Sequence, residues 1–147
     1  MSSPLLAALD PGRSKCGLVL ADATAGRVLQ AAILPPEASR ELLQRWRRQG
    51  LEQLVLGDGT GSRSWQAPLT ALGLTVLLVD ERGSTLAARQ RYWQLGERSG
   101  WRRWLPAGLR LPPRDIDDVV AQLLLERHLE RPLARQAQPP LRSVPAP

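Results

Sequence analysis

The spacing of hydrophobic residues changes several times along the chain, and the first third has the pattern of strands. Short apolar runs at residues 5–10, 17–21 and 27–34 are separated by turn-forming residues. Runs of this length bounded by Gly, Pro, Asp and Ser predict β-strands. Because the connections are short, we expect three antiparallel strands joined in a meander. Pro35-Pro36 then ends the strand pattern.

The middle of the chain alternates between the helical and the strand pattern. Residues 37–49 place Leu42, Leu43 and Trp46 on one side of a helix and end at Gly50. A strand, a helix and a second strand are predicted next, at residues 53–56, 63–72 and 74–79. A helix between two strands predicts a parallel crossover.

The last part of the chain is predicted to contain two helices and a tail. The helices span residues 85–95 and 115–130, and a long connection with three glycines and three prolines, residues 96–114, separates them. Residues 132–147 contain five prolines among small and polar residues, which predicts a disordered tail.

Taken in order, these elements are those of an RNase H-like fold. The prediction is an α/β protein with a mixed five-stranded sheet, in which three antiparallel strands precede two parallel crossovers and helices flank the sheet. With 147 residues, the chain is long enough for about one domain. We assign that domain to residues 1–131.

The charge of the chain is strongly basic. Lys and Arg number 20 against 14 Asp and Glu, and only one of the 20 is Lys, which gives a net charge of +6 and a pI near 11.1. Such an excess favours a polyanionic partner, first of all nucleic acid, although it is also compatible with an ordinary arginine-rich surface. No apolar run approaches a membrane span and no signal peptide is evident, so we expect a cytoplasmic protein with no membrane partner.

Metal chemistry in this chain would depend on carboxylates. With one cysteine, Cys16, and one histidine, His128, the sequence excludes intrachain disulfides, multi-cysteine zinc sites and clustered histidine ligands. Mg²⁺ prefers oxygen ligands and needs only two or three carboxylates besides substrate oxygens. Acidic residues lie at three edges of predicted elements, namely Asp10, Asp80-Glu81 and the group Asp115, Asp117 and Asp118. These edges could converge on one metal site.

Each acidic cluster also has a purely structural interpretation. Asp10 could cap the turn that follows its strand, and Glu81 could pair with a nearby arginine. The acids at residues 115–118 could lie in the first turn of a helix, where the positive end of the helix dipole stabilises negative charge. The glycine-rich loop at residues 57–62 could bind a phosphate on its backbone N–H groups, but it lacks the Gly-Lys-Ser/Thr ending of a P-loop and is better interpreted as a connection.

The acids occur within three longer patterns. In the first, Asp10 is followed by Gly12 and then by Gly17 before the next strand. The second is Asp80-Glu81-Arg82-Gly83-Ser84-Thr85, directly after a strand. The third is Ile116-Asp117-Asp118, followed by a long apolar helix.

In order and spacing, these patterns resemble the YqgF (RuvX) family of Holliday-junction resolvases and pre-16S rRNA processing nucleases, relatives of the RuvC resolvases. The resemblance covers about residues 5–130. The second pattern is similar to the family's Asp-Glu-Arg-x-Thr-Thr segment, with Ser84 in place of the first Thr. The family usually has Gly-Leu-Pro after the fourth strand, whereas this chain has Gly57-Asp58-Gly59-Thr60.

The resemblance implies which residues carry the chemistry. Asp10, Glu81 and Asp117 would be the catalytic carboxylates that bind Mg²⁺ or Mn²⁺. Asp118 is the alternative on the last helix, because it follows Asp115 by three residues, which is the spacing of the paired acids in the RuvC branch.

Basic and aromatic residues predict a nucleic-acid surface. Residues 89–114 combine seven arginines with one Tyr and three Trp, a composition suited to phosphate contacts and base stacking. Packing of these aromatic side chains against the core is the competing interpretation. The residues expected to contact nucleic acid are Arg13, Lys15, Arg82, Arg89, Arg98, Trp101, Arg102 and Arg103.

The sequence thus predicts a Mg²⁺- or Mn²⁺-dependent endonuclease that hydrolyses phosphodiester bonds in structured nucleic acid. The resemblance implies either pre-16S rRNA end processing or cleavage of branched DNA, and symmetric cleavage of four-way junctions would require a homodimer. The alternative is a nucleic-acid-binding module with the same fold and little or no catalysis. A nucleotide-binding relative of actin and the sugar kinases is disfavoured because that architecture needs two such domains.

Overall fold

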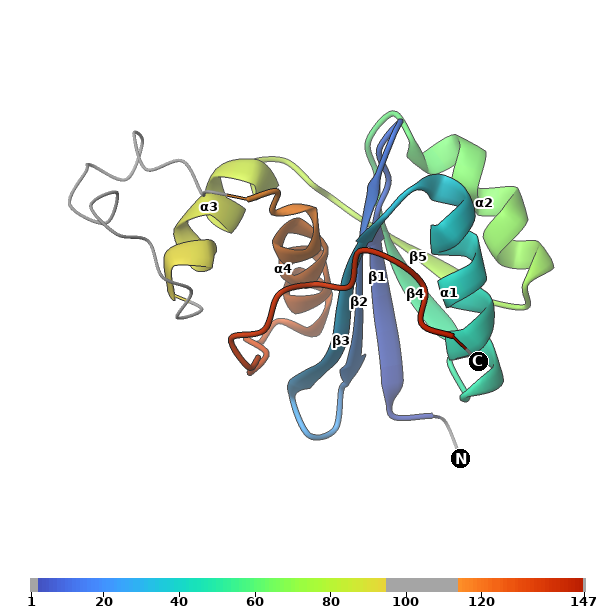
Figure 1. The fold of residues 1–147 in the computed structure, drawn as a ribbon, viewed down its shortest axis with the longest axis horizontal. Helices are drawn as coiled ribbons and strands as arrows, with labels where there is room; N and C mark the ends of the chain where they lie inside the picture. Colours follow the sequence, from blue (N-terminus) through green and yellow to red (C-terminus); the bar gives the residue numbers. More distant parts are fainter. Residues whose placement is uncertain (1–2, 95–113, 147) are drawn as a thin grey trace.

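The computed structural model describes residues 3–94 and 114–146, which form five strands and four helices (Figure 1). Their order agrees with the elements predicted from the sequence. The strands are β1 (Leu5–Asp10), β2 (Cys16–Asp22), β3 (Arg27–Leu34), β4 (Gln53–Gly57) and β5 (Thr75–Val79). The helices are α1 (Pro36–Arg48), α2 (Ser62–Ala71), α3 (Ser84–Gln94) and α4 (Asp117–Leu129).

The strands form one mixed sheet in the order β3-β2-β1-β4-β5. β2 is antiparallel to both β1 and β3, while β4 is parallel to both β1 and β5. The meander therefore supplies one half of the sheet and the two crossovers supply the other. This is the topology of the RNase H-like fold, and the predicted fold class is confirmed.

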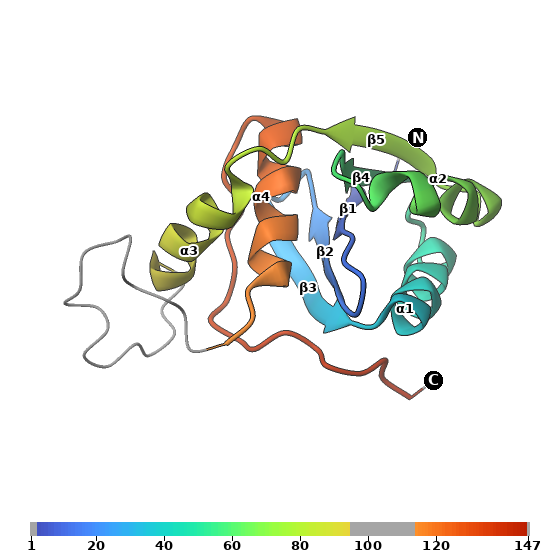
Figure 2. The ribbon, with the colours of Figure 1, turned by 90° about the horizontal axis from the view of Figure 1, so that it is seen from above.

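Alternate residues of each strand face opposite layers of helices (Figure 2). In β1, Ala7 and Leu9 belong to the core with α1 and α2, whereas Leu6 and Ala8 belong to the core with α4. This alternation follows from the two-residue period of a strand. Asp10 has the same parity as Ala8, so its side chain lies on the α4 side of the sheet.

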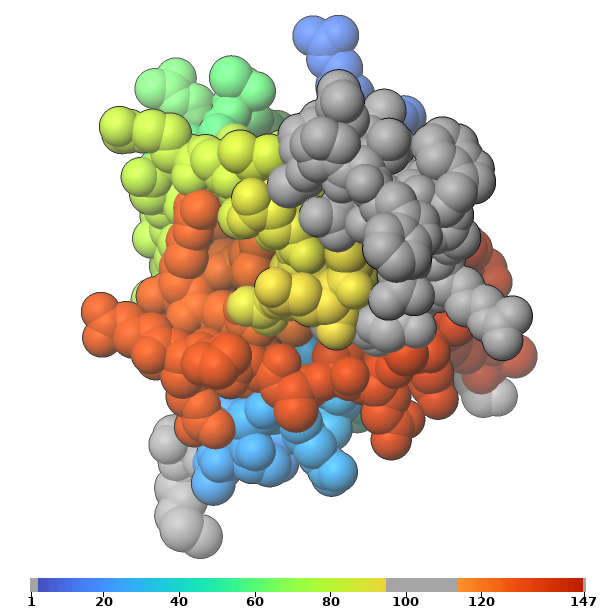
Figure 3. All heavy atoms as spheres, turned by 90° about the vertical axis from the view of Figure 1, so that its left-hand side faces the viewer, coloured from blue at the N-terminus to red at the C-terminus, as the bar shows by residue number. Residues whose placement is uncertain are grey.

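The helix α3 packs on α4 rather than on the sheet. Ala88 of α3 forms a small core with Val119, Val120 and Leu123 of α4. Figure 3 shows α3, α4 and the chain that follows α4 side by side on one face of the molecule. Among the helices described, none is long and apolar enough to cross a membrane.

The prediction of a disordered tail over residues 132–147 is wrong for residues 132–146. This part of the chain runs along the outer edge of β3 and makes parallel bridges at Ala134 and Leu141. Leu133 is buried against the α4 side of the sheet, and Leu141 packs on the opposite core. The segment is ordered because it satisfies the backbone groups of an edge strand and buries apolar side chains.

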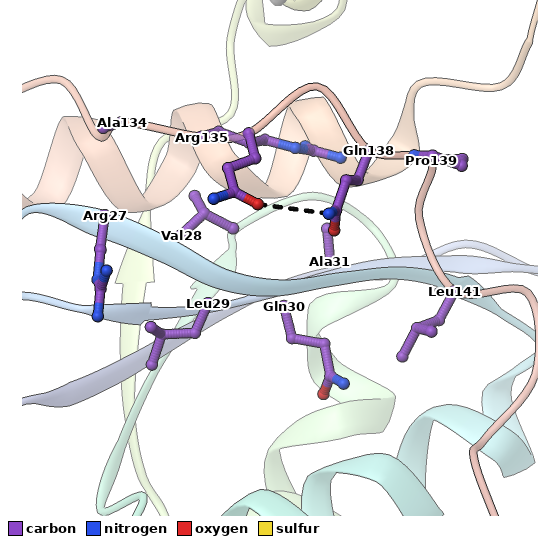
Figure 4. Close-up of a pocket in the computed structure, with 11 residues that line it drawn as sticks. Arg27, Val28, Leu29, Gln30, Ala31, Ala134, Arg135, Gln138, Pro139 and Leu141 are labelled. Atoms are coloured by element: carbon purple, nitrogen blue, oxygen red, sulfur yellow. Dashed lines mark hydrogen bonds between the residues drawn. The ribbon is translucent and has the colours of Figure 1, made fainter.

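Between its two bridges the segment leaves β3 and encloses a groove of about 630 Å³ (Figure 4). Gln30 and Leu29 of β3 lie on one side of the groove, and Gln138 and Pro139 on the other. None of the three predicted catalytic carboxylates lines it.

Candidate active site

Asp10 lies at the end of β1, where the strand opens into a turn. In the antiparallel register Asp10 pairs with Gly17 of β2, and the preceding residue, Leu9, pairs with Leu56 of the parallel strand β4. The carboxylate makes no hydrogen bond or ion pair with any residue in the part of the chain described. The alternative interpretation of Asp10, that its side chain caps the following turn, is therefore wrong.

Glu81 follows β5 and reaches toward the end of β4 through a space that two glycines leave open. A Cβ atom at Gly57 would lie 2.6 Å from Glu81 Oε2, and a Cβ at Gly59 would collide with the same carboxylate. Asp58, between the two glycines, accepts a hydrogen bond from the Glu81 backbone N–H at 3.2 Å. The loop after β4 thus holds Glu81 in place, and its glycines are required for the close approach.

Asp117 is brought to the same end of the sheet by the start of α4. A Cβ atom at Gly17 would collide with the backbone carbonyl of Asp117 and lie 2.9 Å from the backbone nitrogen of Asp118. Because Gly17 is the partner of Asp10, the absence of a side chain lets α4 begin directly over the end of β1. Asp10, Glu81 and Asp117 are each partly exposed to solvent.

The three carboxylates are electrostatically coupled through Asp10. Burial, followed by the negative charges of Glu81 and Asp117, raises the pKa of Asp10 from 3.8 to about 7. Burial also raises the pKa of Glu81, with further increases from Asp58 and Asp80, against a lowering hydrogen bond from the Gly59 backbone. The pKa of Asp117 is raised by burial, and Lys15 partly offsets this increase.

The three carboxylates do not form a preformed metal site. Within residues 3–94 and 114–146, no group of three or more His, Cys, Asp and Glu side chains is arranged so that it could hold a metal ion as it stands. The structure brings Asp10, Glu81 and Asp117 to one end of the sheet but leaves space between their side chains.

Asp118 and Asp115 are engaged by basic residues. Asp118 is fully buried and pairs with Arg135 at 2.5 Å and with Arg114 at 2.8 Å. Asp115 is exposed and pairs with Lys15 at 2.5 Å, and this hydrogen bond is the main cause of its lowered pKa. Of the acids near the start of α4, Asp117 is the one whose charge acts on Asp10.

The residues predicted to contact nucleic acid have different environments. Arg13 and Arg82 are exposed, the latter with 91% of its side chain accessible, and both lie in turns at the carboxylate end of the sheet. Lys15 is bound to Asp115, and Arg89 lies partly buried on α3. Four others lie outside the described residues, namely Arg98, Trp101, Arg102 and Arg103.

Part of the arginine- and aromatic-rich stretch is used within the protein. Arg91 pairs with the buried Glu126 at 2.7 Å, and Tyr92 is buried with its ring 5.1 Å from that of Trp93. The guanidinium of Arg114 lies 5.2 Å from the Tyr92 ring. For Arg91, Tyr92 and Arg114, the packing interpretation is the one the structure supports.

Sequence reasoning missed the supporting residues of the site. Gly57 and Gly59 were interpreted as a connection, although their spacing on either side of Asp58 is a signal for close approach by another segment. Arg135 was assigned to a disordered tail, and nothing in the local sequence indicates that its partner is Asp118.

The chain is similar to two solved structures of RuvC from Thermus thermophilus. One is described as a complex with a Holliday junction substrate and has 17% identity and a TM-score of 0.48, over 84% of this chain and 95% of that chain. The other has 16% identity and a TM-score of 0.46, over 84% and 96% of the two chains. Neither a protein-family model nor a curated protein matches the sequence. The fold assignment rests on the strand order and pairing given above.

Proposed function

We propose that this protein is a divalent-metal-dependent endonuclease whose catalytic residues are Asp10, Glu81 and Asp117. The observation that carries the proposal is that the end of β1, the turn after β5 and the start of α4 bring these three acids to one end of the sheet. Burial and the charges of Glu81 and Asp117 accordingly raise the pKa of Asp10. Negative charge gathered at one end of a sheet, on side chains with access to solvent, is typical of a functional site.

The donor set suits Mg²⁺ or Mn²⁺. Carboxylate oxygens are the ligands that these cations prefer, and a site for them keeps several positions for water and substrate phosphate. In the structure the Glu81 carboxylate lies against Gly57 and Gly59, so the three carboxylates would have to approach one another to share an ion. When bound, a divalent cation would offset the repulsion among the carboxylates, activate water and stabilise the leaving oxygen.

The residues of the chain have separable roles in this reaction. Asp10 would be the central ligand, with Glu81 and Asp117 completing the set from β5 and α4. Arg13 and Arg82 would contact substrate phosphates near the same end of the sheet. Water adds to phosphorus, the bond from phosphorus to the leaving oxygen breaks, and the proton lost by water ends on that oxygen.

The substrate we propose is structured nucleic acid, either branched DNA or the end of pre-16S rRNA. The proposal follows from the basic charge and from the resemblance to the YqgF family. A protein that cuts both strands of a four-way junction would work as a homodimer.

Cleavage assays on two labelled substrates test the function. A four-way DNA junction and a pre-16S rRNA fragment are incubated with wild type, Asp10→Asn or Glu52→Gln, in Mg²⁺, Mn²⁺ or EDTA. We expect metal-dependent cleavage of one substrate by wild type and by Glu52→Gln, an exposed control acid, and at least a 100-fold loss in Asp10→Asn. Tight binding without cleavage by any of the proteins would instead identify a nucleic-acid-binding module.

A further inference from the structure

The chain after α4 is tied to the first turn of that helix by a buried ion pair. Here the C-terminal segment denotes residues 131–146. In it, the side chain of Arg135 is 4% exposed and donates from Nη2 to Oδ2 of Asp118 at 2.5 Å. Arg114 donates to Oδ1 of the same carboxylate at 2.8 Å. Both oxygens of Asp118 are therefore used inside the protein, at the residue next to Asp117.

The backbone beside Arg135 is fixed on two elements. Ala134 donates to the Gly26 carbonyl at 2.9 Å and accepts from the Val28 N–H at 2.8 Å, which holds it to the start of β3. Leu133 donates to Oε2 of the buried Glu126 at 2.8 Å, which holds it to the last turn of α4. The guanidinium of Arg135 thus extends from an anchored point and not from a free tail.

The side chain of Arg135 is directed toward α4 at the place where the segment leaves β3. Figure 4 shows Arg135 next to Ala134, at one end of the stretch that arches over the groove. Its Nη1 also donates to Oε1 of Gln122, one turn further along α4, at 3.3 Å. Arg135 therefore contacts α4 at two successive turns, and these polar contacts add to the apolar packing that holds the helix on the sheet and on α3.

Rotation of α4 decides where Asp117 lies. Neighbouring residues of a helix are separated by about 100° around its axis, so holding Asp118 against Arg135 also sets the direction of Asp117. The backbone contact of Asp117 with Gly17 sets the distance from β2. Together the two contacts determine the position of the Asp117 carboxylate relative to Asp10.

We infer that Arg135 is a positioning residue of the candidate active site: by holding Asp118, it orients the first turn of α4 so that Asp117 is directed toward Asp10. The inference rests on the proposed nuclease function and adds a contribution from the C-terminal segment. Arg135 itself does not contact the substrate in this proposal.

The test compares Arg135→Gln and Arg135→Lys with Arg131→Gln. Arg131 is the matched control, because it also anchors the segment, through a hydrogen bond to the Ala23 carbonyl at 3.2 Å, but has no contact with Asp118. We expect Arg135→Gln to lower kcat at least ten-fold with less than a two-fold change in KM. The affinity for Mn²⁺, measured without nucleic acid, should also fall at least ten-fold. Arg135→Lys should recover part of both losses, and Arg131→Gln should retain wild-type values.

Amide hydrogen exchange gives a readout that does not depend on activity. In Arg135→Gln the amides of Val119 and Val120, which donate to the Ile116 carbonyl, should exchange at least ten-fold faster, while those of β1 keep wild-type rates, which also shows that the variant is folded. Unchanged exchange at Val119 and Val120, or equal losses of kcat in Arg135→Gln and Arg131→Gln, would overturn the inference.

The two proposals fail in different ways. A wild-type protein that neither binds Mn²⁺ nor cleaves either substrate would overturn the nuclease function, and the catalytic part of this inference with it. An active wild type with an equally active Arg135→Gln variant would overturn the positioning role alone.

Discussion

At the scale of single residues, Asp10 is the least favourable carboxylate for the metal-free fold. Its pKa of about 7 means that the folded protein holds a proton that the unfolded chain has lost above pH 4. A group of this kind lowers the free energy of unfolding as the pH rises from about 4 to 7. The loss of unfolding free energy caused by Asp10 is complete above pH 7, where its carboxyl is ionised in both the folded and the unfolded protein.

Asp10→Asn is accordingly expected to stabilise the metal-free protein at pH 8. At ~1.4 kcal/mol per pKa unit, a rise from 3.8 to about 7 corresponds to ~4 kcal/mol at most. Because Asp10 is partly exposed to solvent, we expect a gain of roughly 2–4 kcal/mol, which should vanish near pH 4. Urea unfolding in EDTA at several pH values measures it, with Glu52→Gln as the exposed control. A gain that does not depend on pH would contradict the raised pKa.

Adjacent acids on α4 have different environments in this structure. Asp117 is partly exposed and acts on Asp10, whereas Asp118 is fully buried between Arg135 and Arg114. Replacing one partner of a buried ion pair leaves the other charge unpaired, and this typically costs about 3–5 kcal/mol.

The pair Asp117→Asn and Asp118→Asn separates these roles. Asp118→Asn should lower the free energy of unfolding by ~3 kcal/mol or more. Asp117→Asn should change it by less than about 1 kcal/mol while abolishing metal-dependent cleavage. Denaturant unfolding and cleavage rates for the two variants provide the comparison, and the reverse pattern would make Asp118 the ligand on α4.

At the scale of elements, the candidate active site depends on a close backbone approach of α4 to β2. The start of the helix lies on the backbone of Gly17, and a side chain there would overlap with the Asp117 carbonyl. The carbonyl belongs to the backbone of a helix that is packed on the sheet, so it cannot move without displacing the helix.

Gly17→Ala should therefore separate α4 from β2. We expect it to destabilise the protein by ~1–3 kcal/mol and to reduce cleavage at least ten-fold. Gly61→Ala is the matched control, because its Cβ would meet only Pro11, the side chain at 3.1 Å and 3.3 Å and the backbone carbonyl at an ordinary contact distance of 3.6 Å. Equal effects of the two substitutions on cleavage would argue against a specific requirement at Gly17.

The boundaries of the elements could be predicted from the sequence to within one or two residues. Local information is sufficient there, since the hydrophobic period and the turn residues lie within each element. The sequence also singles out Asp10 and Glu81, because an acid at the end of an apolar run is visible locally. It does not decide between Asp117 and Asp118, because their partners lie far along the chain.

At the scale of the whole molecule, the C-terminal segment completes the fold. It pairs with the edge of β3 and contributes Leu133 and Leu141 to the cores on both sides of the sheet. Without it, β3 would present a free edge to other chains. The proline content that suggested disorder is compatible with this role, because backbone pairing takes place only around Ala134 and Leu141.

A chain ending at residue 131 tests this role directly. We expect it to lose at least ~3 kcal/mol of unfolding free energy, from exposed apolar surface and the loss of Arg135 from the buried Asp118, and to self-associate through β3. Denaturant unfolding and light scattering measure the two effects. A disordered tail would leave both quantities unchanged when removed.

The sequence by itself determined the elements, their order and thus the sheet, together with the acids at the ends of β1 and β5. These features follow from the spacing of apolar residues over a few positions, which decides what each element can bury. Only the tertiary structure decided that Asp118 is structural, that Gly17 makes room for the backbone of α4 and Gly57 and Gly59 for the Glu81 carboxylate, and that the C-terminal segment is ordered. Each of these depends on contacts between distant segments, such as Gly17 with Asp117 and Asp118 with Arg135, and no local pattern encodes which segments meet.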